Sequence, residues 1–457
     1  MPGQPLRGRS EPQPSGRGRR LADHPSAAAL RSPALRRYLA GQLPSVTCSW
    51  AQVVALAWVV VQLDPAALGL VILLQFLPTL VIGPWFGALA DRYDRRRLLM
   101  IAETGLALVA AGYALAAAAG ALTLPMIFLL AGVWGVINAL DTPARRAMVP
   151  MLVPSGLAPA ASALTGTAML FGMTAGSALG GILVSTVGVS LTFLINAASF
   201  AADVIILATI RTGPSPRVAR AAGQVRAGLR YLWSTPPLRA TMIAFALVAT
   251  FGFTLQVSVP ILVRVTFDGG PDLVGAAFTA GTAGSLAGMV ATAARRGADP
   301  PSLARAAAGL GAALLLTAAA PVVPVLLFAL AAAGFAWSVC IIAATATLQS
   351  AEPAMTGRVM AIFAAVLLGG TATGGPIAAA VADLTDPRAP FVVGTLAAAG
   401  AAFLASTGRA RFRTGTFATF LALHSAYRPT RRITPLAPRS AATRHNRCDT
   451  PPERPRM

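Results

Sequence analysis

Two carboxylates in otherwise apolar stretches are the residues best suited to do chemistry. Asp203 lies about midway along the stretch 190–210, and Glu103 lies about one turn inside the stretch 98–120. A carboxyl group held away from water favours its neutral form, so it is suited to take up and release a proton or to bind a cation. We expect Asp203, together with Glu103, to take part in proton coupling or to bind a cationic group. The alternative is that Asp203 pairs with a polar neighbour only for packing.

The stretches that carry these carboxylates are long enough to cross a bilayer. The chain is 55% hydrophobic and 12% charged, whereas a globular domain is about 25% charged. A span needs roughly 20 apolar residues, and a helix satisfies its own backbone polar groups in lipid. We therefore expect an all-α membrane protein with twelve transmembrane helices. The predicted spans are 38–62, 67–90, 98–120, 123–140, 162–187, 190–210, 240–263, 273–294, 303–320, 323–346, 357–383 and 388–406.

Glycine pairs suggest that the twelve spans form two repeats of six. Gly172 and Gly176 in span 5 match Gly370 and Gly374 in span 11 at an offset of 198 residues, and the same shift carries span 1 to the start of span 7. We expect an N-terminal half over 38–210, a linker over 211–239 and a C-terminal half over 240–406. Within the linker, residues at helical spacing indicate an amphipathic helix on the inner face of the membrane. These residues are Arg226, Leu229, Arg230 and Trp233.

The distribution of arginine predicts the orientation. The 37 basic residues are all arginine, and nineteen of them lie in the tails 1–37 and 407–457, which we expect to be disordered. The loops after even-numbered spans carry sixteen arginines, and those after odd-numbered spans carry two. Because positive charge stays on the cytoplasmic side, we expect both termini in the cytoplasm and a multi-pass protein of the inner or plasma membrane.

The segment Gly87–Arg97 holds four arginines and two aspartates between spans 2 and 3. It resembles the signature loop G-x-L-A-D-R-x-G-R-R of the major facilitator superfamily, with Asp94 in place of the second glycine. In span 5 the sequence resembles the G-x-x-x-G-P-x-x-G-G pattern of the family's antiporters, with Ser177 in place of proline. The glycines of that pattern are Gly172, Gly176, Gly180 and Gly181. Their spacing predicts close approach to another helix, either for ordinary packing or for an antiporter-specific seal.

Three further stretches are similar to the branch that includes the enterobactin and macrolide exporters. They are Asn138–Pro150, Leu229–Leu238 and Gly357–Ala361. The resemblance covers about 38–406, and it implies a fold in which two six-helix halves rock about a central site. Within the first of these stretches, Asp141-Thr142-Pro143 is itself typical of a helix start, with a structural capping role.

The resemblance also implies roles for single residues. Asp91 is expected to reach the start of span 11, near Gly357 and Arg358, when the cytoplasmic face closes, and the alternative is that the arginines only enforce topology. The expected gating residues are Gly87, Asp91, Arg92, Arg95, Arg96, Arg97, Arg145, Arg146 and Arg358. The central cavity is expected between spans 1, 4, 7 and 10, although each candidate there is also suited to helix-to-helix hydrogen bonds. These candidates are Gln52, Asn138, Gln256 and Trp337.

We expect a secondary transporter that exports an amphiphilic small molecule, such as a drug or siderophore, in exchange for protons by alternating access. The alternatives are an uptake permease and a transporter-like membrane sensor or scaffold.

No lysine is present, so no phosphate-binding G-x-x-x-x-G-K-[ST] loop exists. The three cysteines have no metal spacing, and no hydrolytic or redox constellation is visible. We expect no enzyme activity, no cofactor and no metal. The expected partners are the substrate, protons and the lipid bilayer; despite a net charge of +21 we expect no nucleic acid, and we expect a monomer.

Overall fold

The computed structural model describes residues 25–210, 224–252, 254–295 and 302–426, and in these residues it contains helices joined by short connections and no strand. The described residues up to Ala410 form one compact unit, and those from Arg411 belong to a second. The long helices of the N-terminal half are α2 (Pro33–Leu63), α3 (Ala67–Arg92), α4 (Arg95–Ala118), α5 (Leu124–Met148), α6 (Ala158–Thr186) and α7 (Gly188–Thr209). The helices after them are α8 (Gln224–Ser234), α9 (Pro236–Leu247), α10 (Leu255–Thr266), α11 (Pro271–Ala294), α12 (Leu303–Ala319), α13 (Val323–Gln349), α14 (Pro353–Leu384) and α15 (Ala389–Ala426). A short helix α1 (Pro25–Ala29) precedes α2.

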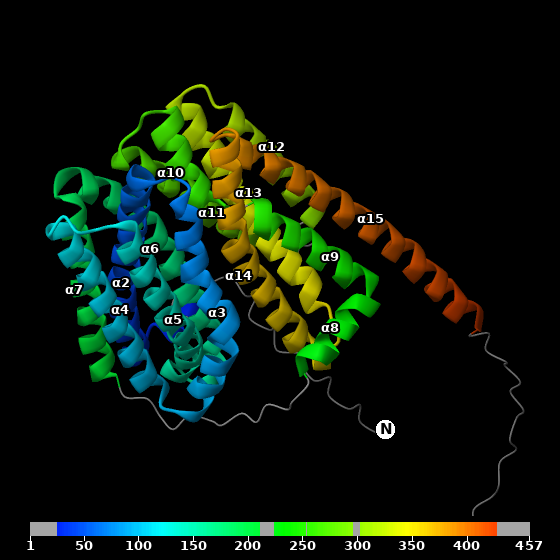
Figure 1. The fold of residues 1–457 in the computed structure, drawn as a ribbon. Helices are drawn as coiled ribbons and strands as arrows, with labels where there is room; N and C mark the ends of the chain where they lie inside the picture. Colours follow the sequence, from blue (N-terminus) through cyan, green and yellow to red (C-terminus); the bar gives the residue numbers. More distant parts are fainter. Residues whose placement is uncertain (1–24, 211–223, 253, 296–301, 427–457) are drawn as a thin grey trace, which may run out of the picture. The chain divides into compact units, whose positions relative to one another are not determined.

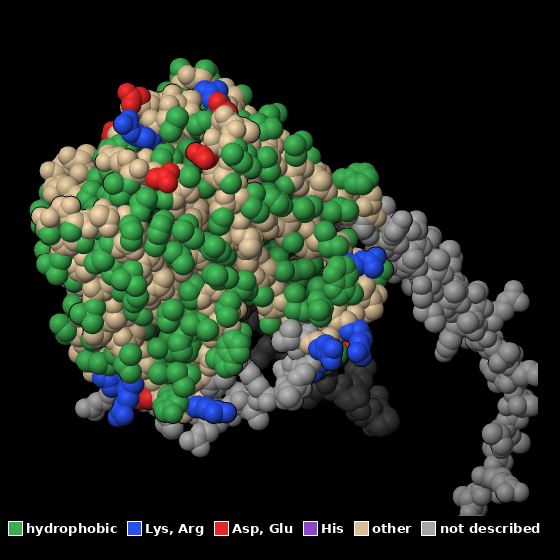
Figure 2. Space-filling view, in the orientation of Figure 1, with side chains coloured by type: hydrophobic (Ala, Val, Ile, Leu, Met, Phe, Trp, Pro, Cys, Tyr) green, Lys and Arg blue, Asp and Glu red, His purple; other side chains and the backbone are tan. Residues whose placement is uncertain are grey.

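The described helices agree with the all-α membrane fold expected from the sequence. Eleven segments are long and apolar enough to cross a membrane, and the apolar helix Leu303–Ala319 is slightly shorter. Predicted span 7 corresponds to α9 and α10, which are joined by a π-helical turn at Val248–Gly252. On the face shown in Figure 2, charged side chains gather mainly toward the two ends, and the surface between them is mostly hydrophobic. Such a band suits a lipid environment.

Several helix ends differ from the predicted spans. The helix α2 begins at Pro33, because Ser32 caps it by accepting from the Leu35 amide, and α15 continues to Ala426. Residues 25–29 and 33–37 are therefore helical although the tail 1–37 was predicted to be disordered. Residues 1–24 of that tail, 211–223 of the linker and 427–457 lie outside the described residues.

The prediction that Asp141-Thr142-Pro143 begins a helix is wrong. All three residues lie inside α5, which continues to Met148 with Pro143 in its interior. Asp141 does not cap a helix, because it pairs with Arg145 one turn further along the same helix. The helix α5, which carries both residues, is packed against neighbouring helices.

The two halves lie side by side and meet along two pairs of helices. In the N-terminal half α2 packs against α6 and α7, and in the C-terminal half α11 packs against α13 (Figure 1). Between the halves, α6 packs against α11 and α3 packs against α14. We call these two contacts the α6–α11 seam and the α3–α14 seam.

The glycines that suggested a repeat make equivalent contacts in the two halves. On α6, a Cβ added at Gly176 would lie 2.8 Å from Cβ of Trp50 on α2. On α14, a Cβ added at Gly374, which the offset of 198 residues pairs with Gly176, would lie 3.0 Å from the carbonyl carbon of Thr250 in the π-helical turn. In each half the missing side chain lets the fifth span approach the first span closely.

Candidate functional site

A buried cluster of charged side chains surrounds Arg145 in the N-terminal half. Its guanidinium donates from Nε to Asp141 Oδ2 at 3.1 Å and from Nη2 to Asp141 Oδ1 at 3.1 Å. Nη2 also contacts Glu103 Oε1, and Nη1 lies 3.8 Å from Asp203 Oδ2. A further hydrogen bond runs from Nη1 to the Tyr38 hydroxyl at 3.5 Å. We call these five residues the Arg145 cluster.

The residues of the Arg145 cluster lie on four helices. Glu103 lies on α4, Asp141 and Arg145 on α5, Asp203 on α7 and Tyr38 on α2. Asp141 and Arg145 are four residues apart and therefore share one face of α5. The other pairings are tertiary contacts, since α4 packs against both α5 and α7.

Gly41 on α2 provides the space for the Asp203 carboxyl group. A Cβ added at Gly41 would overlap Asp203 Oδ1 and would lie 3.2 Å from its Cγ. The carboxyl groups of Asp203 and Glu103 also adjoin each other beside the shared guanidinium. Asp203 is thus enclosed by α2, α4 and α5 at once.

The cluster contains more acidic than basic groups. Glu103 is 0% exposed, Asp203 1% and Asp141 7%. Three carboxylates against one guanidinium leave two negative charges when every group is ionised. Burying uncompensated charge is costly, so taking up protons stabilises the cluster. The chemistry that this arrangement offers is reversible protonation of neighbouring carboxyl groups, or binding of a cation.

The charged segment between α3 and α4 is shorter than predicted, and one of its residues caps α4. The link between α3 and α4 is Tyr93 and Asp94 alone. Asp94 caps α4, because its Oδ1 accepts from the amides of Arg96 at 2.9 Å and Arg97 at 3.4 Å. An aspartate in place of the family's glycine therefore adds a helix cap.

Two arginines of this segment bind the ends of other helices. Arg95 Nη1 donates to the Ala147 carbonyl at 3.2 Å, near the end of α5. Arg96 Nε donates to the Leu207 carbonyl at 2.8 Å, near the end of α7. Arginine at a helix C-terminus satisfies free carbonyl groups and complements the helix dipole. Arg97, in contrast, is exposed and lies 3.8 Å from Asp94.

The remaining predicted gating residues are not brought together with these contacts. Gly87 and Arg92 lie near the end of α3, and Arg92 is exposed. Arg146 is exposed at the end of α5, and Arg358 is half-buried on α14. The Asp91 side chain is outside the described part of the structure, so its expected contact with the start of α14 stays a prediction.

The four glycines predicted for span 5 divide between two neighbours. Gly172, Gly176 and Gly180 face α2, where an added Cβ at Gly180 would lie 2.8 Å from Cα of Ala51. Gly181 instead faces α11, and an added Cβ at Gly275 would lie 2.7 Å from Cα of Gly181. The pattern therefore serves helix packing within the N-terminal half and also the α6–α11 seam.

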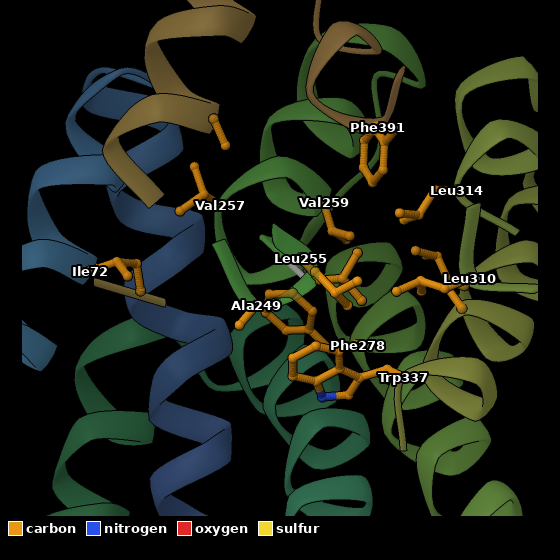
Figure 3. Close-up of a cluster of buried hydrophobic side chains, with 14 of the residues drawn as sticks. Ile72, Ala249, Leu255, Val257, Val259, Phe278, Leu310, Leu314, Trp337 and Phe391 are labelled. Atoms are coloured by element: carbon orange, nitrogen blue, oxygen red, sulfur yellow. The ribbon is translucent and has the colours of Figure 1, made fainter. Parts of the chain in front are cut away.

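A cavity of about 240 Å³ lies beside this seam. Its lining is mostly apolar and aromatic, with a few hydroxyl and amide groups. The lining residues are Trp50, Leu170, Met173, Leu255, Gln256, Val259, Ala277, Phe278, Gly281, Thr282, Ser285, Met289, Trp337, Ser338, Ile341 and Ile342. In Figure 3 the side chains of Phe278 and Trp337, which both line the cavity, lie below Leu255. The ring of Trp337 stacks with that of Phe245, and the two ring centroids are 6.0 Å apart.

Two of the four predicted cavity residues line this cavity and two do not. Gln256 and Trp337 are part of the lining. Gln52 is buried and accepts a hydrogen bond from Asn196 Nδ2 at 2.8 Å, so it joins α2 to α7. Asn138 is half-buried on α5, outside the described lining.

The helices around the cavity also differ from those predicted. The cavity is lined from spans 1, 5, 7, 8 and 10, whereas spans 1, 4, 7 and 10 were predicted. Spans 5 and 8 take part because α6 and α11 meet in the seam, which places their side chains beside the cavity.

Residues 25–416 match the family described as transmembrane secretion effector, which is a family of major facilitator transporters. The chain belongs to the major facilitator superfamily. Among curated relatives of this superfamily member, the multidrug efflux pump Tap of Mycolicibacterium fortuitum is 28% identical over 357 residues, covering 74% of this chain and 87% of that protein. The staphyloferrin A transporter of Staphylococcus aureus is 25% identical over 249 residues, 53% of this chain. The chain spans 62% of the length of that relative.

Solved structures agree on the fold of this superfamily member. A bacterial homologue of the iron transporter ferroportin, in an inward-facing state, matches with a TM-score of 0.65 at 18% identity. The match covers 83% of this chain and 98% of that structure. At this identity the likeness concerns the fold alone.

The sequence did not predict that Asp141, Tyr38 and Gly41 take part in forming the Arg145 cluster. Asp141 was interpreted as a cap, although its spacing of four residues from Arg145 is a recognisable ion-pair signal. Tyr38 and Gly41 carried no signal, because their roles depend on the side chains that α4, α5 and α7 bring to them.

Proposed function

We propose that the protein is a proton-coupled exporter of bulky amphiphilic small molecules, working by alternating access in the cell membrane. The Arg145 cluster is the observation that carries this proposal. Three buried carboxylates share one guanidinium there, with Asp203 and Glu103 side by side. Protons entering the cluster remove its excess negative charge, and protons leaving restore it. A buried group that changes charge in this way is suited to couple proton movement to transport.

The cavity supports a bulky, largely apolar substrate. Trp50, Phe278 and Trp337 offer aromatic faces, and Gln256 and Ser285 offer a small number of hydrogen-bonding groups. Binding sites for drug-sized molecules combine an apolar lining with few polar groups in this way. The names of the relatives, a multidrug efflux pump and a siderophore transporter, also favour export of such compounds.

The glycine contacts between the halves support a conformational state in which the two halves are closed against each other at one end. At the α3–α14 seam, a Cβ added at Gly69 would lie 2.7 Å from Cα of Pro376, and at the α6–α11 seam Gly181 meets Gly275. Both contacts lie at the end of the helices opposite to Asp94 and the arginines that follow it. With the arginine-rich end in the cytoplasm, as positive charge favours, this state is closed on the outside and receives substrate from the cytoplasm. Export then requires both contacts to separate.

The proposal is tested with the full chain in proteoliposomes carrying an imposed pH gradient, with ethidium as the transported probe. Asp203→Asn is nearly isosteric but cannot change its charge. We expect it to reduce gradient-driven accumulation at least tenfold while probe exchange without a gradient continues. Glu103→Gln should behave in the same direction. Glu352→Gln is the matched control, because Glu352 is exposed at the start of α14.

The same assay separates the competing functions. Full gradient-driven transport by Asp203→Asn contradicts the coupling role of the cluster. Accumulation driven by an acidic vesicle interior indicates proton antiport, whereas accumulation driven by an acidic exterior indicates an uptake permease. If a panel of amphiphilic probes shows no exchange with the wild-type protein, the carrier proposal fails in favour of a sensor or scaffold.

A further inference from the structure

One face of α8 carries cationic and apolar side chains together. Arg226, Leu229, Arg230 and Trp233 follow one another at helical spacing, and all four are exposed. Leu229 is 42% exposed and Trp233 is 51% exposed. We call these four residues the α8 stripe. The sequence of the helix contains no acidic residue, so nothing on α8 neutralises the two guanidinium groups.

The opposite face of α8 is fixed to the start of α14. Leu232 is 3% exposed, and a Cβ added at Gly228 would lie 2.8 Å from Cβ of Arg358. The Tyr231 hydroxyl accepts a hydrogen bond from the Glu352 amide at 3.3 Å. These contacts determine which side of α8 faces away from the protein, so the stripe is a consequence of tertiary packing.

Neither water nor the bilayer core suits the α8 stripe. Eleven residues make a helix of about 16 Å, which is too short to cross a hydrocarbon core of ~30 Å. Exposed tryptophan and leucine favour removal from water, while arginine must keep its charged group hydrated or paired. The membrane–water interface meets both needs. Arg239 adds a third cation, since its Nη1 donates to the Trp233 carbonyl at 3.4 Å.

We propose that the α8 stripe binds the headgroups of anionic phospholipids, with Leu229 and Trp233 inserted at the level of the acyl-chain boundary. Charge complementarity selects anionic over zwitterionic lipid, because arginine side chains near a negatively charged membrane surface are attracted to it. Bidentate hydrogen bonding to a phosphate suits the guanidinium group. This binding does not depend on the transport activity proposed above, so either proposal can fail without the other.

The experiment uses quenching of tryptophan fluorescence in the full chain by brominated lipids. The protein is placed in vesicles that contain equal mole fractions of brominated phosphatidylglycerol or brominated phosphatidylcholine. The chain has six tryptophans, so the signal of Trp233 is obtained by subtracting that of Trp233→Phe. We expect phosphatidylglycerol to quench this signal at least twice as strongly as phosphatidylcholine. The double variant R226Q/R230Q should remove the difference.

Two further variants make the result specific. R226K/R230K keeps the charge and should keep most of the preference, which separates lost charge from lost folding. R97Q removes an exposed arginine next to Asp94 and should leave the preference intact. Equal quenching by the two lipids, or no quenching by either, overturns the proposal. So does a preference that survives R226Q/R230Q or disappears in R97Q.

Discussion

Gly41 shows how a single missing side chain determines the position of a charged group. The carboxyl group of Asp203 occupies the space that a Cβ on residue 41 would fill. The same carboxyl group lies 3.8 Å from Arg145, which is already engaged with Asp141 and Glu103. A displacement of Asp203 away from α2 would therefore change the distances within the whole Arg145 cluster.

Gly41→Ala should destabilise the protein. The added methyl group overlaps a charged atom that is enclosed on three sides, and overpacking of this kind typically costs 1–3 kcal/mol. Thermal unfolding of the purified protein in detergent checks this as a midpoint lowered by several degrees. Gly132→Ala on α5 is the control, since nothing lies within 4 Å of its added Cβ. An unchanged midpoint for Gly41→Ala would show that Asp203 does not depend on this space.

Among the helices, α4 has the start most clearly determined by one residue. Only Tyr93 and Asp94 separate it from α3, and Asp94 accepts from two amides of its first turn. The arginines at the same start then reach the ends of α5 and α7 through Ala147 and Leu207. Correct placement of this helix start thus also places the cations that cap two neighbours.

Asp94→Ala should cost about 0.5–2 kcal/mol, the usual loss when a capping residue is replaced by alanine. Asp94→Ser keeps an oxygen that accepts from the same amides, so it should retain most of the stability. Asp94→Gly restores the residue of the family pattern and should be intermediate, because glycine is tolerated at this position without a side-chain hydrogen bond. Denaturation midpoints of the three variants give the order. If alanine and serine prove equally stable, the cap contributes nothing.

At the scale of the whole molecule, two seams join the halves, and both are tight at the same end. Gly69 approaches Pro376 in the α3–α14 seam, and Gly275 approaches Gly181 in the α6–α11 seam. Backbone atoms in contact leave no flexible side chain to move aside. A larger residue at either position therefore favours separation of the halves at that end.

Gly275→Val should shift the conformational equilibrium away from the state described here. Spin labels at positions 66 and 384, near the ends of α3 and α14, report the opening in a background without the three cysteines. We expect a longer mean distance between the labels in Gly275→Val than in the parent. Gly166→Val is the control, because the site has nothing within 4 Å. Identical distance distributions would mean that the seams do not limit opening.

Local patterns in the sequence were sufficient for the membrane architecture. Runs of apolar residues predicted the helices, since burial in lipid and backbone hydrogen bonding act on each segment independently. The spacing of Gly172 and Gly176 predicted a close helix contact, which the structure places on α2. The motif around Asp94 indicated the superfamily, and the match over residues 25–416 confirms it.

The tertiary structure alone decided which polar groups meet. Asp141 looked like a helix cap, yet packing keeps it inside α5 beside Arg145, and Gln52 pairs with Asn196 rather than lining the cavity. Glu103 and Asp203 were recognised singly as buried acids, but their meeting depends on how α4 and α7 are rotated and packed. Hydrophobicity determines that a segment forms a helix in the membrane. The partners of the polar side chains on that helix depend on contacts between residues far apart in the chain.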